Sequence, residues 1–509
     1  MRRLLPLCAV LAVIVAACDG SDDGGPTAGG TLRVAVVESA VIDPALATDR
    51  TQASIADLVF DGLVAVDAAG AEAVPAIAAE WEATANQRRF TFVLRDDARF
   101  HDGSPVSAAD VKASWERLVA PATGSPLADL LAPVRGFDDA RDGADGLAGV
   151  RAPDERTLIV ELSEPLSDFV LNLTHPALGV LPAGRVRPER TPIGSGPFAV
   201  ASRAGGTVTL ERAGEGAALV DSVELEIVST SDAAAEAVAE GTADITLVPG
   251  TSPPPAGASV VGAPYLAVGY YAMNLNNPKL ADERFRSAIA LAVDRSKLVD
   301  RAYEGAAGVA DSVVSADVAG DDDHACDDRC GADPERAATL LRQVFGREAP
   351  PTLFLDYDET DLQERVAREL RRQLADAGIP AELRPHPPGE YDEFLANGAP
   401  ELFRFGWVGE APAARDFLEP VFVPGSPENV LGVDAPALVR HLNAAGGAET
   451  SDVRDEAYHA AQRTVMDQWA VIPLAQFTTR YAAGERVRDL EISVFGTIDG
   501  ARVWIEEPS

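Results

Sequence analysis

A strand–helix–strand unit in the second half of the chain limits the fold more than any other segment. Residues 352–357 are dominated by leucine and aromatic side chains and predict a strand, and residues 380–385 predict another. Between them, residues 361–377 predict a helix, because an apolar side chain recurs every four positions, at Leu362, Val366, Leu370 and Leu374. Such a helix carries the chain back along a sheet, so the two strands should pair in parallel. The unit predicts a lobe of the α/β class.

Similar patterns along the rest of the chain predict further elements and more than one domain. Ser107 and Asp110 form a capping box that opens a helix, whereas residues 121–149, rich in Gly, Asp and Ala, predict a loop or a loosely packed insertion. At 509 residues the chain has room for about three domains. Strands are also predicted at residues 31–37, 90–95, 157–162 and 472–477, and helices at 49–58, 334–345 and 453–469.

The N-terminus carries signals of export and of lipid attachment. Residues 1–17 hold a short basic segment and then about fourteen apolar residues, too few to span a membrane and typical of a signal peptide. Val15-Ala16-Ala17-Cys18 resembles the bacterial lipobox, which implies lipidation of the Cys18 sulfur; the alternative is an ordinary cleaved signal. Residues 18–30 are polar and glycine-rich and predict a flexible tether. We expect a lipid anchor on the extracytoplasmic face of the cell membrane.

Acidic residues outnumber basic ones by a wide margin. Asp and Glu number 80 against 43 Lys and Arg, which gives a formal net charge of −37. This charge argues against a nucleic-acid partner, because phosphate binding requires a basic surface. It should instead keep the folded body soluble and hold it away from the anionic lipids near which it is tethered.

Several segments, in the same order along the chain, resemble one known protein family. They are residues 74–82 (VPAIAAEWE), 90–111 with its HDGSPVSAADV run, 192–198 (PIGSGPF), 273–276, 285–295 and 405–407. Each is weak evidence alone. Together they resemble extracellular solute-binding protein family 5, whose members are the oligopeptide-, dipeptide- and nickel-type receptors of ABC importers. The resemblance covers nearly all of residues 31–495.

The resemblance implies an α/β fold with the bilobed, three-domain architecture of type II periplasmic binding proteins, the Venus flytrap. Ligand would lie buried between lobes that close by a hinge motion. His101-Asp102-Gly103 and Gly194-Ser195-Gly196 are then expected to be structural turns rather than catalytic groups. In this arrangement residues 31–58, 177–264 and 479–509 would form a discontinuous lobe I, residues 59–176 an inserted domain II and residues 265–478 lobe III.

The most specific candidate site is the segment Gly406-Trp407-Val408-Gly409-Glu410. It resembles the Gly-Trp-x-x-Asp segment of peptide-binding members, whose acidic side chain contacts the α-ammonium group of the ligand, and Glu410 stands at that position. A carboxylate in a closed cleft needs a cation, which a ligand amine would supply. The alternatives are an exposed loop carboxylate or an ion pair with Arg415. Trp407 would stack on the ligand or simply pack.

Five further residues are candidates for ligand contact because of their place in the resemblance. Glu38 and Ser39 follow the first predicted strand, where members of the family contact their ligands. Tyr270, Tyr271 and Asn274 fall near the expected crossing between the lobes and would face the cleft. The alternative for all five is a packing role or a backbone turn.

Cys326 and Cys330 lie in an acidic segment beside His324. Outside the cytoplasm oxidation is the default, which predicts a local disulfide that closes a short loop. The alternative is a metal site built from Cys, His and Asp ligands. We favour the disulfide and expect no metal.

These observations predict an extracytoplasmic binding protein that captures a peptide or peptide-like solute and delivers it to an ABC permease and its ATPase. The alternative within the same fold is a receptor for a non-peptide solute such as a nickel chelate, an oligosaccharide or an opine-like compound. The sequence contains no nucleophile–base set, catalytic metal motif or phosphate loop. We therefore expect a monomeric protein that is not an enzyme and holds no cofactor.

Overall fold

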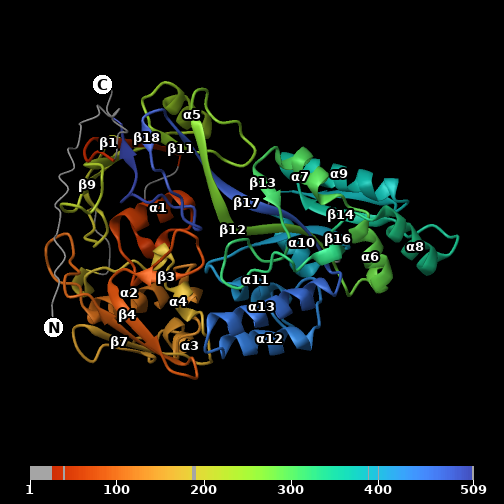
Figure 1. Cartoon of the computed structure of the whole chain (residues 1–509), viewed down its shortest axis with the longest axis horizontal. Coiled ribbons are helices and arrows are strands. Elements are labelled where there is room, and N and C mark those ends of the chain that lie inside the picture. The colour runs from red at the N-terminus through yellow and green to blue at the C-terminus, as the bar shows by residue number, and fades with distance from the viewer. Residues whose placement is uncertain (1–25, 38–40, 186–190, 388, 399, 507–509) are drawn as a thin grey trace, which may run out of the picture.

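Two long antiparallel strands, β12 (Ser259–Met273) and β17 (Val471–Ala483), run through the molecule and join its two halves (Figure 1). We call the half that holds the N-terminal strand lobe I, the opposite half lobe III, and the unit of residues 64–161 domain II. Domain II lies beside lobe I (Figure 1), and Asp168, just after it in the chain, accepts a hydrogen bond from Tyr458 of lobe III. The computed structural model describes residues 26–37, 41–185, 191–387, 389–398 and 400–506.

Lobe I is built on one end of a mixed sheet. From the two connecting strands the order continues β17-β11-β1-β10-β9-β8. These strands are β1 (Thr31–Val36), β8 (Phe198–Ala204), β9 (Thr207–Arg212), β10 (Ser222–Ile227) and β11 (Ile245–Leu247), and a short pair, β18 (Val487–Arg488) and β19 (Trp504–Ile505), adjoins them.

The central strand of lobe I is β1, which pairs in parallel with β10 on one side and β11 on the other. Its successive side chains point to opposite faces, as in any strand. Leu32, Val34 and Val36 pack with α1 (Arg50–Val59), whereas Ala35 packs with α5 (Ser231–Ala239). The two helices therefore cover opposite faces of the same parallel strands.

Domain II has a core of its own. The capping box predicted at Ser107 is confirmed, since Ser107 and Asp110 bond reciprocally at the start of α2 (Ala108–Val119), and α2 buries Trp115 completely. The strands of domain II are β2 (Val64–Val66), β3 (Ala73–Pro75), β4 (Ala78–Ala83), β5 (Arg89–Leu94), β6 (Val150–Arg151) and β7 (Thr157–Glu161), of which the last four form one sheet in the order β4-β5-β7-β6.

The prediction of a loosely packed insertion at residues 121–149 is wrong. The segment forms a short 3-10 helix at Ala128–Leu131 and helix α3 (Phe137–Arg141). Leu131 and Val134 are fully buried in the core of domain II. The few apolar residues of the segment are spaced too irregularly to show a helical period, and only their contact with α2 and the sheet decides their burial. A single turn, α4 (Phe169–Asn172), follows domain II.

Lobe III continues the large sheet in the order β15-β14-β16-β12. The parallel pairing predicted from the strand–helix–strand unit is confirmed: β14 (Leu353–Asp358) pairs in parallel with β15 (Ala381–His386), and α9 (Asp361–Asp376) connects them. β16 (Leu402–Val408) lies between β14 and β12, parallel to the first and antiparallel to the second. A short strand, β13 (Ala307–Val309), pairs with β17.

Two layers of helices cover the sheet of lobe III. Tyr271 packs on the face shared with α6 to α9, and its neighbour Tyr270 packs on the face shared with α10 to α13. Besides α9, the helices are α6 (Glu283–Leu291), α7 (Arg295–Tyr303), α8 (Pro334–Phe345), α10 (Tyr391–Asn397), α11 (Ala414–Phe422), α12 (Pro436–Gly446) and α13 (Ser451–Met466).

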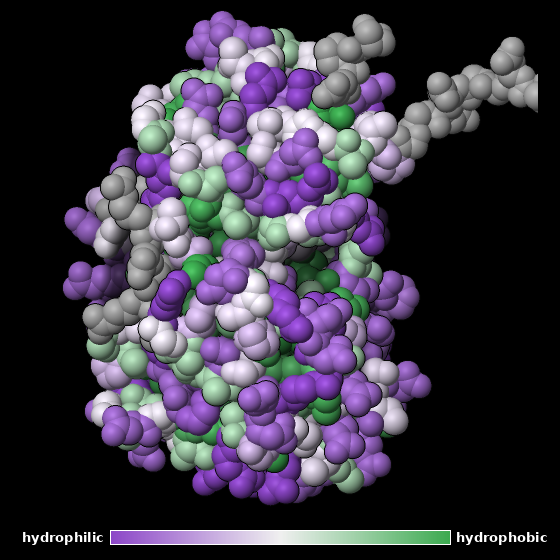
Figure 2. Space-filling view, turned by 90° about the vertical axis from the view of Figure 1, so that its left-hand side faces the viewer, coloured by the Kyte–Doolittle hydropathy of each residue, from purple (hydrophilic) through white to green (hydrophobic). Residues whose placement is uncertain are grey.

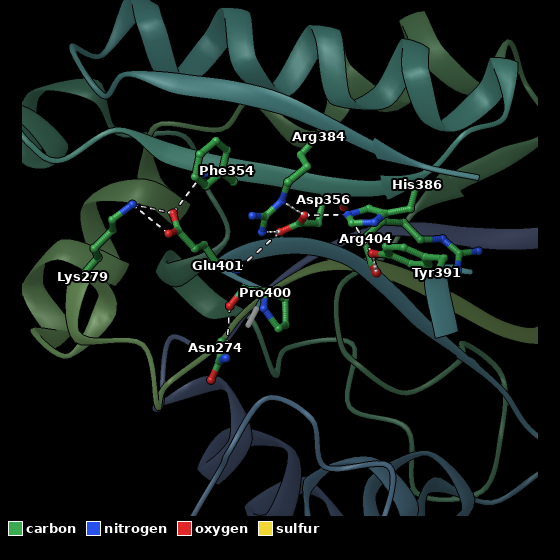
Figure 3. Close-up of polar contacts among 10 residues, drawn as sticks. All are labelled: Asn274, Lys279, Phe354, Asp356, Arg384, His386, Tyr391, Pro400, Glu401 and Arg404. Atoms are coloured by element: carbon green, nitrogen blue, oxygen red, sulfur yellow. Dashed lines mark hydrogen bonds and ion pairs between the residues drawn. The ribbon is translucent and has the colours of Figure 1, made fainter. Parts of the chain in front are cut away.

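A buried charge holds the edge of this sheet together (Figure 3). The Asp356 carboxylate on β14 is 0% exposed and accepts hydrogen bonds from Arg384 Nη2 at 2.7 Å and His386 Nε2 at 2.9 Å, both on β15. The Tyr391 hydroxyl donates to the backbone carbonyl of Arg404 at 2.6 Å. The contacts link three neighbouring strands and a helix, so they fix the position of β16.

A second carboxylate, Glu401, anchors the start of β16 (Figure 3). It accepts hydrogen bonds from Lys279 Nζ at 2.7 Å and from the backbone N–H of Phe354 at 2.9 Å. The Glu401 side chain is 9% exposed, so the paired charge lies largely out of water. Both anchors lie at the opposite end of β16 from Glu410.

Two turns predicted to be structural are confirmed as such. The His101 ring accepts from the backbone N–H of Gly194 at 3.2 Å and bonds to the carbonyl of Gly196 at 3.1 Å, which ties the two turns together. A Cβ on Gly194 would lie 1.9 Å from the carbonyl oxygen of Val59, so only glycine fits there. Burial lowers the pKa of His101.

The surface accords with the acidic composition. Hydrophilic residues cover most of the face formed by lobe I and domain II, with hydrophobic ones in small, separate areas (Figure 2). Within the described part of the chain, no helix combines the length and the hydropathy that crossing a membrane requires.

The structure joins Cys326 and Cys330 by a disulfide, with Cα atoms 5.3 Å apart. We expect iodoacetamide to alkylate neither cysteine of the secreted protein in denaturant until a reductant is added. Because the closed loop is short, its loss should lower the free energy of unfolding by only about 2 kcal/mol. Alkylation of either residue without reductant, detected by mass spectrometry of the 326–330 peptide, would contradict the pairing.

Candidate functional site

β16 leads directly into the segment that carries Glu410. The strand pairs with β12 along its whole length, and the backbones approach so closely that a Cβ on Gly406 would lie 2.6 Å from the carbonyl oxygen of Val268. At the next glycine, Gly409, a Cβ would lie 2.7 Å from the Phe417 ring. The two glycines therefore allow the strand to end against α11 and to turn Glu410 away from the sheet.

The turn is fixed by Asp416, in the first turn of α11. Its Oδ2 accepts the backbone N–H groups of Glu410 at 2.6 Å and Ala411 at 3.3 Å. Burial raises the pKa of Asp416 to about 6, although the two N–H donors oppose that rise. Asp416 thus positions the backbone of the turn and leaves the Glu410 side chain free for other contacts.

The Glu410 carboxylate is half-buried and has no cationic partner among the described residues. Burial raises its pKa to about 7, and the negative charges of Asp416 and of Asp129 in domain II add to the rise. The alternative pairing with Arg415 does not form, because Arg415 bonds to Glu419 at 2.8 Å and to the Leu442 carbonyl. Asp129 is ion-paired with Arg141, and Asp416 bonds to backbone N–H groups, so Glu410 is the carboxylate that a cation placed between lobe III and domain II would pair with.

A cavity of about 170 Å³ lies in lobe III beside this segment. We call it the lobe III cavity. Tyr270 and Tyr271 border it, and their hydroxyl groups, on opposite faces of β12, are buried and form no hydrogen bond. Burial raises the pKa of both. Its lining consists of residues 267–271, Tyr303, Gln363, Val366, residues 404–408, Leu474 and Phe477.

Trp407 combines a packing role with an unused donor. Its ring packs against the core that contains α11 and α13, and the residue also borders the lobe III cavity. The indole Nε1–H is buried and has no partner. The Tyr270 ring contacts the Phe405 ring in a tilted arrangement, with 5.9 Å between ring centres. The side chains of Trp407 and Tyr270 therefore lie on one face of the sheet and that of Tyr271 on the other, although all three residues border the lobe III cavity.

Arg404 is the charged residue that sequence reasoning missed. It is the one charged side chain among the described residues lining the lobe III cavity, and its Nε lies 3.5 Å from Asp358 Oδ1. The signal was present: Arg404 interrupts the otherwise apolar run Leu402–Val408. The Arg404 side chain is 40% exposed, so its charge stays partly solvated where the residue lines the lobe III cavity.

The remaining candidates lie elsewhere. Asn274 follows β12, and its side chain stabilises a turn. The amide nitrogen donates to the Pro400 carbonyl at 3.1 Å (Figure 3). The amide oxygen accepts from the Asn276 N–H at 3.0 Å. It does not line the lobe III cavity. Glu38, Ser39 and Cys18 lie outside the described residues.

The acidic segment around the disulfide offers no clear ligand set for a metal. The His324 side chain is 78% exposed and approaches only Asp323, at 3.6 Å. In the ranges that the structure describes, no group of three or more His, Cys, Asp and Glu side chains is arranged to hold an ion.

The two halves joined by paired strands, with a cavity and an uncompensated charge near their junction, define a bilobed solute-binding protein. The chain belongs to the bacterial extracellular solute-binding proteins of family 5, whose model matches residues 72–429.

Its relatives include binding proteins from several bacteria. The periplasmic murein peptide-binding protein MppA of Escherichia coli is 28% identical over 481 residues, covering 87% of this chain and 86% of MppA. A probable di/tripeptide-binding protein of Pseudomonas aeruginosa is 26% identical over 486 residues, covering 89% and 90%. The probable deoxycholate-binding protein YgiS of E. coli is 28% identical over 460 residues, covering 85% of each chain.

Solved structures confirm the bilobed periplasmic binding fold. The unliganded open form of MppA matches with a TM-score of 0.82 at 25% identity, covering 93% of this chain and 97% of that one. A second structure of MppA from E. coli matches at only 0.66, with 93% and 98% covered.

Proposed function

We propose that this protein captures a peptide between its lobes and delivers it to an ABC importer. The observation that carries the proposal is the Glu410 carboxylate, half-buried beside two other acids and without a cation. A free peptide N-terminus carries an ammonium group at neutral pH. Such a group would neutralise the cluster and form charge-assisted hydrogen bonds with Glu410.

The rest of the site supports the same ligand. Arg404 offers a cation to a peptide carboxylate, and the unpartnered hydroxyl of Tyr271, which lies on the same face of the sheet, offers a hydrogen bond to a peptide carbonyl. A peptide needs both charges and hydrogen-bond donors for its carbonyl groups. The names of MppA and of the Pseudomonas relative, which refer to murein peptides and di/tripeptides, support a peptide for this chain as well.

The proposal is tested by isothermal titration with tripeptides and their N-acetylated counterparts. We expect tripeptides to bind and acetylation to weaken binding at least about 30-fold, because it removes the charge that Glu410 would pair with. Tripeptides with an amidated C-terminus are the matched control, because they lose the carboxylate charge and keep the ammonium group. Equal affinity of free and acetylated peptides would contradict the role of Glu410.

The alternative is a non-peptide solute such as a nickel chelate, an oligosaccharide or an opine-like compound. The similarity to YgiS, whose name refers to deoxycholate, supports a non-peptide ligand as the alternative. Failure of every peptide in a mixed library to bind, while native mass spectrometry of the secreted protein shows a carried ligand of other chemistry, would favour it.

The setting of the protein is part of the proposal. Signal residues 1–17 would be removed, Cys18 would be lipidated, and residues 18–30 would tether a monomer to the extracytoplasmic face of the membrane beside a permease and ATPase. The lipobox and the polar, glycine-rich tether support this. The division into lobe I (31–58, 177–264, 479–509), domain II (59–176) and lobe III (265–478) would let the lobes close about β12 and β17.

A further inference from the structure

Lobe I contains a cavity of about 250 Å³ between α1 and the parallel strands β1, β10 and β11. We call it the lobe I cavity. Its walls are core residues: Leu32 and Leu225 are 2% and 3% exposed, yet both border empty space. Further apolar wall residues are Val34, Val36, Ile55, Leu58, Val223, Leu247 and Ile498. Protein cores hold few voids larger than a water molecule, and empty apolar volume destabilises the fold. A ligand group that fills a void of this size would therefore stabilise the protein.

A few polar groups lie at this cavity. Ser54 on α1 is 7% exposed and lines the cavity beside the Tyr481 hydroxyl. That hydroxyl donates to the Gly496 carbonyl at 3.0 Å. At the rim, Arg50 stacks on the Tyr265 ring at 4.1 Å, and its Nε is buried without a partner. An apolar wall with a few polar groups is typical of a ligand pocket.

The position of the cavity in the sheet is also that of a binding site. Its rim is formed by Val37, which follows β1, by Leu247 at the end of β11, and by Arg50 and Ser231 at the starts of α1 and α5. These helices leave the sheet on opposite faces. In open α/β sheets, ligands bind beyond the carboxyl ends of the strands at such a point.

A chain of shared residues connects the lobe I cavity with the lobe III cavity. Arg50 and Leu247 also line a small cavity of about 80 Å³ at the crossing of the lobes. Tyr303 and Phe477 line both that small cavity and the lobe III cavity. One extended ligand could therefore reach from Arg404 to the wall of lobe I.

We propose that the lobe I cavity receives a bulky apolar side chain of the captured peptide, so that the protein selects peptides containing a residue such as leucine. The inference rests on the proposed peptide ligand and adds a side-chain preference to it. The occupant would fill the void, and the peptide backbone at the rim would satisfy Arg50.

The test compares trialanine with three tripeptides that carry leucine at the first, second or third position, by isothermal titration. Burial of a leucine side chain should make at least one of them bind about 10- to 100-fold more tightly than trialanine. Ser54→Leu places an apolar side chain inside the cavity and should reduce that ratio below about threefold. Ser202→Leu, at an exposed position on β8 of the same lobe, is the matched control and should retain the ratio.

Thr51→Leu, at the half-buried rim, provides a second test if Ser54→Leu does not fold, as judged by circular dichroism. Equal binding of leucine peptides and trialanine to the native protein would overturn the side-chain preference while leaving peptide capture intact. An unchanged ratio in a folded cavity variant would overturn it equally. Absence of binding by all peptides would refute the proposed function and this inference with it.

Discussion

Glu410→Gln is expected to lower the affinity for a tripeptide by about 100-fold. The substitution keeps the shape of the side chain but removes the charge that would pair with the ligand ammonium group. Truncating one member of a buried, hydrogen-bonded charge pair costs about 2–5 kcal/mol, or roughly 30-fold and upwards. Isothermal titration with trialanine measures the loss, and the variant should bind N-acetyl-trialanine about as well as the native protein does.

The affinity for a tripeptide should depend on pH through the Glu410 carboxyl. Burial and the charges of Asp416 and Asp129 raise the pKa of Glu410 to about 7 when no ligand is bound. Below that pH the carboxyl is protonated, so affinity should fall by up to tenfold per pH unit. A peptide amine loses its proton above about pH 8, so affinity should fall again there. Asp416, whose pKa is raised to about 6, adds to the acid limb only at lower pH.

The matched control is Glu428→Gln, the same substitution at an exposed position in lobe III. It should leave both the affinity and its pH profile unchanged. In Glu410→Gln the fall in affinity between pH 7 and 6 should largely disappear. If native affinity is flat from pH 6 to 8, or if Glu410→Gln retains native affinity, then the ammonium group is bound elsewhere.

Asp356→Ala is expected to lower the free energy of unfolding by about 3 kcal/mol. Removal of one partner from a buried ion pair leaves the other uncompensated, at a cost of about 3–5 kcal/mol. Here Arg384 and His386 both lose their acceptor (Figure 3). The lower end of the range applies because the Arg384 side chain is 34% exposed and water can solvate it. Urea unfolding followed by circular dichroism measures the change.

The control for this prediction is Asp300→Ala, an exposed position within α7. Surface substitutions of this kind usually change stability by no more than about 0.5 kcal/mol. Asp356→Asn keeps the volume and one acceptor oxygen, so its loss should fall between those of the two alanine variants. An unfolding midpoint of Asp356→Ala equal to that of Asp300→Ala would show that the network in Figure 3 does not stabilise lobe III.

The local architecture could be predicted from sequence where a pattern is complete within one segment. The helical repeat from Leu362 to Leu374, bounded by two strands, gave α9 and the parallel pair β14–β15. The capping box at Ser107 likewise contains both of its partners within four residues. The burial of residues 128–141 was missed because the groups that cover them come from α2 and from a distant sheet.

In the candidate site, too, some residues could be predicted from a local pattern and others could not. The Gly-Trp-x-x-Glu segment could be recognised in the sequence, and Glu410 and Trp407 with it. Arg404 and the lobe I cavity could not, because their importance depends on neighbours contributed by strands and helices far apart in the chain. Asn274 was singled out by its nearness to β12, but its amide is used by a turn that folding creates.

The sequence by itself determined the α/β class, the family and the acidic residue on which the proposed binding mode depends, because each is written in a short, contiguous pattern. Only the tertiary structure decided that Glu410 has no cation while Arg415 bonds to Glu419, and that lobe I encloses empty apolar space. A charge or a cavity is defined by what surrounds it, and the surroundings here are assembled from segments up to several hundred residues apart. Packing therefore settles what a local pattern leaves open.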